Sequence, residues 1–108
     1  MTSFRDELKE LRNWLAEQKG GVRTYMEVQQ RLETMGLDAK HPALTRMLAD
    51  LAGRFIDVYD GEPLVVGVAE TALARLTALV EAAAALPEGD AAQELQLLNE
   101  IGRTELSA

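Results

Sequence analysis

The fold of this chain depends on residues 42–68, which read PALTRMLADLAGRFIDVYDGEPLVVGV. Pro42 suits the first turn of a helix, because an amide N–H at that position has no partner within the helix and its absence costs nothing. Apolar residues then recur at helical spacing, at Leu44, Met47, Leu48, Leu51 and Phe55. This periodicity predicts a helix that begins at residue 42 and buries one face.

The second half of this stretch allows two interpretations. Apolar and polar residues alternate over 56–59 and again over 64–68, and the dipeptide Asp60-Gly61 between them is a favoured two-residue hairpin turn. We therefore favour a short β-hairpin over residues 55–68. In the alternative, the helix continues to Tyr59 and only residues 64–68 are extended. Gly53 would weaken that longer helix by about 1 kcal/mol, which favours the hairpin.

Two further helices are indicated before this stretch. Ser3 is placed to cap the first helix, whose apolar stripe lies at positions 4, 8, 11 and 15, and Gly20-Gly21 would end it. Thr24 and Glu27 form an S/T-x-x-E capping box that would start the second helix. The stripe of that helix consists of Tyr25, Val28, Leu32 and Met35.

Two more helices are indicated after it. Residues 70–86 are rich in alanine and leucine and predict a fourth helix, which Pro87-Glu88-Gly89 would interrupt. Asp90 would cap a last helix over residues 90–104. We expect a single domain over residues 1–108, with a core at about 4–68 and a C-terminal helical pair at 69–104. The expected fold class is mainly α, with about five helices and a small β-hairpin.

The composition excludes several kinds of chemistry. The 108 residues include no cysteine and one histidine, so the chain offers no disulfide, no thiolate metal site and too few nitrogen ligands for most zinc or haem geometries. His41 precedes Pro42 at a helix start, where capping or solvent exposure is its simplest role. Asp57, Asp60 and Glu62 lack an EF-hand pattern and suit a solvated turn. No phosphate-binding loop occurs, so we expect no catalytic, cofactor or metal site, and no enzyme.

Charge is distributed unevenly along the chain. Residues 1–54 hold 9 Lys/Arg and 8 Asp/Glu, whereas residues 55–108 hold 2 Lys/Arg and 10 Asp/Glu, a net charge of −8. The second half should therefore repel nucleic acid and anionic membranes. The first residues lack the basic-then-apolar order of a signal peptide, and the longest low-charge stretch, residues 76–86, is too short to cross a bilayer. We expect a cytoplasmic protein that does not associate with membranes.

The order of elements over residues 22–68 resembles the winged helix-turn-helix family in layout. Residues 24–35 correspond to the second helix, residues 42–52 to the recognition helix and residues 55–68 to the wing. The resemblance implies DNA binding, in which the recognition helix presents polar side chains to base edges and the wing offers Arg or Lys to phosphates. It also implies dimerisation through added C-terminal helices.

The residues at these positions suit a protein partner better than DNA. The outward face of the third helix includes Arg46, Ala49, Asp50 and Gly53, of which only Arg46 is a good reader of bases, and the expected wing is acidic. Phosphate contacts supply most of the affinity for nucleic acid. Small residues at positions 49 and 53 would let a partner backbone approach, so these four residues are the candidate partner-binding face, with an ordinary solvated face as the alternative.

The sequence therefore favours a non-enzymatic regulatory or adaptor protein that binds another protein, for example one that sequesters or inhibits a transcription regulator in the manner of an antiactivator. The alternative is a DNA-binding winged-helix transcriptional regulator. The fourth helix has more apolar surface than a small core should need, and the last helix adds a leucine-rich face. We expect a homodimer, with candidate contacts at Leu73, Leu76, Val80, Leu98 and Ile101.

Overall fold

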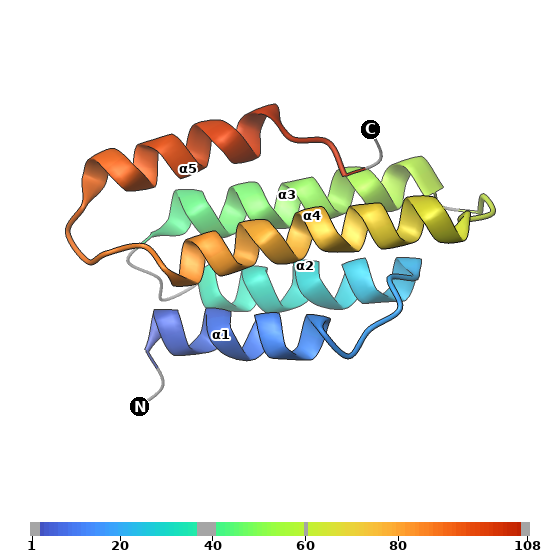
Figure 1. Cartoon of the computed structure of the whole chain (residues 1–108), viewed down its shortest axis with the longest axis horizontal. Coiled ribbons are helices and arrows are strands. Elements are labelled where there is room, and N and C mark those ends of the chain that lie inside the picture. The colour runs from blue at the N-terminus through green and yellow to red at the C-terminus, as the bar shows by residue number, and fades with distance from the viewer. Residues whose placement is uncertain (1–2, 37–40, 60, 107–108) are drawn as a thin grey trace.

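The computed structural model describes residues 3–36, 41–59 and 61–106, and the regular secondary structure within these ranges is all α-helix. The five helices are α1 (Phe4–Leu15), α2 (Val22–Gly36), α3 (Pro42–Tyr59), α4 (Val66–Ala84) and α5 (Ala91–Arg103). Consecutive helices run in opposite directions along the long axis of the molecule (Figure 1). None of the helices in the described ranges combines the length and the apolarity that crossing a membrane requires.

The helices pack as two pairs, and a fifth helix runs alongside one helix of each pair. α2 and α3 form the most extensive pair, and α1 packs mainly on α4. α3 and α4 make little direct contact with each other, although they follow one another in the chain, and α5 packs on both (Figure 1). The seam between α3 and α4 is therefore covered by α5 and is not closed by the two helices themselves.

One cluster of buried side chains receives residues from all five helices. The apolar stripes predicted for the first three helices supply about half of it, as Leu8, Leu11, Leu15, Tyr25, Val28, Leu32, Leu44, Leu48, Leu51 and Phe55. α4 and α5 add a second wall, made largely of Ala72, Leu76, Val80, Leu97 and Ile101. The three stripes predicted before residue 56 are thus confirmed as core-facing.

The predicted β-hairpin over residues 55–68 is wrong. α3 continues to Tyr59, as the alternative interpretation had it, and α4 begins at Val66, which leaves a shorter extended segment than expected. Packing favours the longer helix, because the Phe55 ring lies 4.2 Å from the Tyr25 ring and 4.9 Å from the Tyr59 ring, one helical turn away. The wing that the winged-helix layout implies is therefore not formed by these residues.

The Asp60-Gly61 signal marks the end of a helix instead of a hairpin turn. Gly61 adopts a φ of 76°, in the left-handed region that glycine occupies without strain, and the Glu62 amide donates to the Tyr59 carbonyl at 3.1 Å. Asp60 itself lies outside the described residues. A glycine in this conformation terminates helices as readily as it forms hairpins, so the dipeptide alone could not distinguish the two.

Inside α3, Gly53 lies against the end of the Gln29 side chain of α2. A Cβ atom at this position would lie 2.6 Å from Nε2 of Gln29 on α2. The glycine that weakens this long helix therefore leaves room for a side chain of the neighbouring helix.

The starts of α1, α3 and α5 match the sequence, whereas α2 and α4 begin earlier than expected, α4 at Val66 and not at residue 70. The Ser3 side chain accepts from the Asp6 amide at 3.1 Å, and Asp90 accepts from the Gln93 amide at 3.0 Å, so both predicted caps are confirmed. The capping box at Thr24 is wrong: α2 begins two residues earlier, at Val22, and Thr24 is buried in its first turn.

Candidate protein-binding surfaces

The four residues predicted to bind a partner on α3 do not form one exposed face. Arg46 and Asp50 are exposed, whereas Ala49 is only 3% exposed and belongs to the core. Gly53 lies one turn after Ala49 on the same side of α3, beneath Gln29 of α2. Ala49 is thus not available to a separate protein, whereas Gly53 is partly exposed beside the Gln29 side chain.

The five predicted dimer contacts are mostly interior to a single chain. Leu76 and Val80 are fully buried, and Ile101 is 1% exposed. Leu73 and Leu98 are half-buried and pack against the same core. The apolar excess that suggested a dimer is absorbed largely by the contact of α4 with α1 and α5.

A group of exposed valines lies where α3 passes into α4. Val58, in the last turn of α3, is 53% exposed, and Val65 and Val66, at the start of α4, are 65% and 70% exposed. We call these three residues the valine surface. The exposed carboxylates Asp57, in the last turn of α3, and Glu62, in the connection to α4, are close to these valines in the chain, so aliphatic side chains and negative charge occur together at this end of the molecule.

Sequence reasoning assigned these valines to the strands of a hairpin and so did not single them out. The signal that could have found them is the run Leu64-Val65-Val66, since three consecutive apolar residues cannot all face inward at a helix start.

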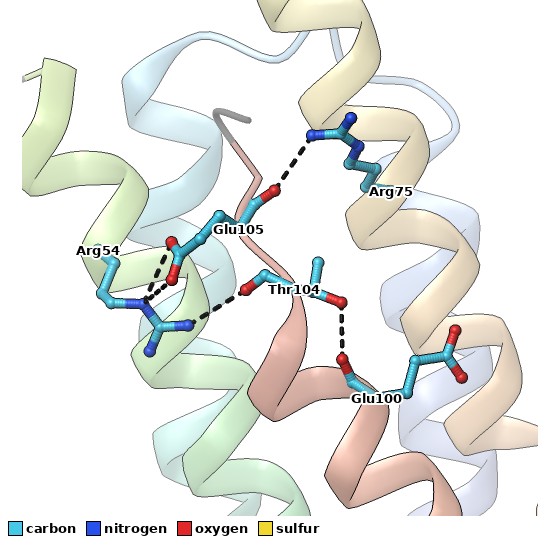
Figure 2. Close-up of polar contacts among 5 residues, drawn as sticks. All are labelled: Arg54, Arg75, Glu100, Thr104 and Glu105. Atoms are coloured by element: carbon cyan, nitrogen blue, oxygen red, sulfur yellow. Dashed lines mark hydrogen bonds and ion pairs between the residues drawn. The ribbon is translucent and has the colours of Figure 1, made fainter.

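A second feature is a pair of arginines that holds the chain after α5. Arg54 of α3 lies 3.2 Å from the Glu105 carboxylate through Nε and donates from Nη2 to the Thr104 carbonyl at 3.4 Å. Arg75 of α4 donates from Nη1 to the Glu105 carbonyl at 3.1 Å and to the Leu106 carbonyl at 3.4 Å. Figure 2 shows the two side chains reaching this segment from opposite sides. We call Arg54 and Arg75, with residues 104–106, the C-terminal clamp.

The clamp holds an extended segment that ends in a buried side chain. Thr104 leaves the helix with φ −87° and ψ 136°, and its hydroxyl donates to the Glu100 carbonyl at 2.7 Å (Figure 2). Two residues later, Leu106 is 2% exposed and belongs to the core. Because most of the arginine contacts go to backbone carbonyls, the clamp recognises an extended chain more than a particular set of side chains.

His41 joins three helices at the opposite end of α5. Its ring packs against Phe4 of α1 with centroids 5.4 Å apart, and its Nδ1 pairs with the Glu94 carboxylate of α5. The imidazole stands immediately before α3, so it links the starts of α1 and α3 to the first turns of α5. Among the described residues, no group of three or more His, Asp or Glu side chains is arranged to hold a metal ion.

An open cleft of about 520 Å³ lies between α1 and α2. Carboxylates from both helices line it, among them Glu7, Glu10 and Glu27. Arg31, the basic residue of the lining, is already engaged: it pairs with Glu27 at 3.0 Å and stacks 4.5 Å from the Trp14 ring. The cleft is therefore a solvated acidic surface with its basic side chain held in place.

Tyr25 is the most unusual buried residue. Its side chain is fully buried, and its hydroxyl has no hydrogen-bond partner among the described residues. Burial raises the pKa of Tyr25 to about 12, because the phenolate would be poorly solvated in the core. Packing of the Tyr25 ring on Phe55 stabilises the buried side chain, whereas the unpaired hydroxyl destabilises it.

Comparison with known proteins gave no relative: no protein-family model, no curated protein and no solved structure matches this chain significantly. Function is therefore inferred from the surface chemistry of the chain itself.

Proposed function

We propose that this protein is a non-enzymatic regulatory or adaptor protein that binds another protein through the valine surface. The observation that carries the proposal is the exposure of Val58, Val65 and Val66, at 53%, 65% and 70%, around one helix-to-helix turn. Apolar groups gathered on a surface commonly mark a site of protein contact. Covering them would contribute roughly 1–2 kcal/mol for each valine.

The charge around the turn indicates the chemistry of the partner. Asp57 precedes Val58 and Glu62 lies between Val58 and Val65 in the chain, and this half of the chain carries 10 Asp/Glu against 2 Lys/Arg. Complementary charge around an apolar contact directs encounter and orientation. The fitting partner therefore has an apolar patch bordered by Lys and Arg.

A transcription regulator is one class of protein that carries such a basic surface, because it must contact phosphates. Binding there would keep the regulator from DNA, in the manner of an antiactivator. This is the specific form of the proposed function.

The test is capture of a partner with matched surface variants. Tagged wild-type protein, the double variant Val65→Asp/Val66→Asp and the control Leu95→Asp would each be incubated with lysate of the native cells. Leu95 is 58% exposed on α5 and lies outside the valine surface. We expect one stoichiometric partner that the wild type and the control retain and the double variant loses. Circular dichroism melts would establish that all three proteins fold.

Retention of the same partner by the double variant would exclude the valine surface as the contact. A duplex DNA selection on the wild type tests the other function considered for this chain. Specific regulators bind their sites at about 10⁻⁸–10⁻¹¹ M. Recovery of a sequence motif at such affinity would replace the proposal with a DNA-binding function.

A further inference from the structure

α5 and residues 104–106, together called the C-terminal segment, are attached to the rest of the molecule by few apolar side chains. Of the 13 residues of α5, only Leu97 and Ile101 are buried, and Leu106 adds a third anchor beyond the helix. The segment lies over the seam between α3 and α4, which scarcely touch each other. The C-terminal segment thus covers side chains of α3 and α4 that these two helices do not cover for each other.

The contacts of the C-terminal segment are those that a helical ligand makes in a groove. One helical face supplies spaced aliphatic side chains, and the extended continuation is held by the two arginines of the clamp through carbonyls and one carboxylate. Spaced aliphatic anchors on an amphipathic helix are the usual basis of helix-in-groove recognition. Basic residues at the end of the groove add selectivity for an acidic continuation.

We propose that the seam between α3 and α4 is a helix-binding groove, that the C-terminal segment fills it in the free protein, and that an amphipathic helix of a partner protein displaces this segment. The partner helix carries Leu or Ile at positions equivalent to Leu97 and Ile101, followed by an extended acidic residue and a leucine. This surface is separate from the valine surface, so the two proposals stand or fall independently.

The attachments of the segment are of a kind that can open while the remaining helices stay folded. Residues 85–90 join α4 to α5 without helix, and Arg5 of α1 donates to the Leu86 carbonyl, which fixes the pivot to the α1–α4 pair. Opening breaks the Arg54–Glu105 ion pair and the contact between His41 and Glu94. Their side chains are between 28% and 53% exposed, so solvent compensates for much of the loss. The pairs α2–α3 and α1–α4 are not involved.

Competition between the C-terminal segment and an added peptide tests the proposal. The probe is a fluorescein-labelled synthetic peptide of residues 88–108, added to the full chain and followed by fluorescence anisotropy. The wild-type chain should bind it weakly, because its own segment occupies the groove and lowers the apparent affinity. Leu106→Asp in the full chain weakens that occupancy and leaves the groove intact. We expect it to bind the peptide about fivefold more tightly.

Two controls identify the binding mode. A peptide that itself carries Leu106→Asp should lose at least tenfold in affinity, whereas a peptide with Leu95→Asp, changed on the exposed face, should bind like the wild-type peptide. In the full chain, adding Arg75→Gln to Leu106→Asp should reduce binding again. A folded Leu106→Asp chain that binds the peptide no better than the wild type would overturn the proposal. If Leu106→Asp does not fold, Glu105→Gln provides the weakened segment and the same expectation.

Native-state hydrogen exchange gives a second measurement that needs no peptide. Amides of α5 should exchange at least tenfold faster than amides of α2 and α3, because the C-terminal segment opens separately. Equal exchange in all helices would overturn the proposal. Light scattering tests whether a second copy of the chain fills the groove instead. A concentration-dependent dimer that Leu106→Asp abolishes would assign the groove to that second copy and would also overturn the proposal.

Discussion

The α2–α3 pair and the C-terminal segment are held by different forces. Between α2 and α3, the buried rings of Tyr25 and Phe55 pack with their centroids 4.2 Å apart, and the Gln29 side chain lies against Gly53. The C-terminal segment has three buried anchors and depends on half-exposed arginines for the rest. Burial of apolar surface is lost only when a helix leaves the core, whereas surface ion pairs exchange readily with water. The first region can therefore open only with the whole molecule, and the second can open alone.

The largest effect is expected in the α2–α3 pair. Leu32 of α2 is fully buried, and Leu32→Ala should lower the free energy of unfolding by about 2–5 kcal/mol, through lost burial and the cavity left behind. Urea denaturation of both proteins measures this. The exposed neighbour Glu33 supplies the control, since Glu33→Ala should change little. A loss below about 1 kcal/mol would show that this pair is not the rigid part of the molecule.

The second effect comes from the Tyr25 hydroxyl and appears at high pH. The pKa of Tyr25 is raised to about 12 in the folded chain, against 10.0 for the ordinary side chain. The folded state thus holds the proton of Tyr25 more tightly than the unfolded state does. The contribution of this difference to the free energy of unfolding is complete below pH 10 and is lost as pH rises towards 12. The loss should be on the order of 2 kcal/mol. Unfolding free energies measured between pH 8 and 12 should show it in the wild type.

Tyr25→Phe is the matched variant for this measurement. It should remove that part of the alkaline loss, and at pH 7 it should be at least as stable as the wild type, because an unpaired buried hydroxyl is removed. A Phe variant clearly less stable at pH 7 would mean that the hydroxyl is hydrogen-bonded in solution.

A smaller effect is expected at the anchor of the C-terminal segment. Leu106 is as well buried as Leu32, yet Leu106→Ala should cost only about 1 kcal/mol, because the cost is limited by the separate opening of the segment. The comparison of these two substitutions in the same urea experiment tests the difference between the regions directly. Equal losses at both positions would mean that the segment belongs to the same cooperative unit as α2 and α3.

The smallest effect concerns the close approach of α2 to α3. Gly53→Ala should stabilise the protein by about 0.5 kcal/mol, since alanine favours a helix interior and the atom in its way is the end of the flexible Gln29 side chain. The thermal melting temperature should rise slightly. A fall would indicate that Gln29 cannot move, and hence that the pair is packed more tightly than the distance implies.

The parts of the fold that could be predicted from sequence are those fixed by local chemistry. The apolar stripes of the first three helices and the caps at Ser3 and Asp90 follow from residues within a turn or two of one another. The turn after α3 could not be predicted in this way, because a glycine in the left-handed conformation, such as Gly61, ends a helix as readily as it forms a hairpin. The contact of the Phe55 ring with Tyr25, two residues that are distant in the chain, favours the longer α3 over the hairpin.

The candidate sites were less accessible to sequence reasoning. Whether Ala49 and Gly53 face solvent or another helix depends on the direction of the α2–α3 packing, which periodicity does not specify. The C-terminal clamp joins Arg54 to Glu105, some fifty positions away, and no local sequence pattern around either residue predicts the contact. Only the valine run at the start of α4 had a signal within the sequence itself.

The pairing of helices also has a kinetic consequence. α2 and α3 are successive helices, so their contact closes only a short loop. The contact between α1 and α4 closes a longer one, because α2 and α3 lie between them in the chain. We expect α2 and α3 to be largely formed in the folding transition state and the C-terminal segment to dock after it. Substitutions in the first region should then slow folding, and those in the second should mainly hasten unfolding. The C-terminal segment would thus lengthen the lifetime of the folded molecule without changing how fast the molecule folds.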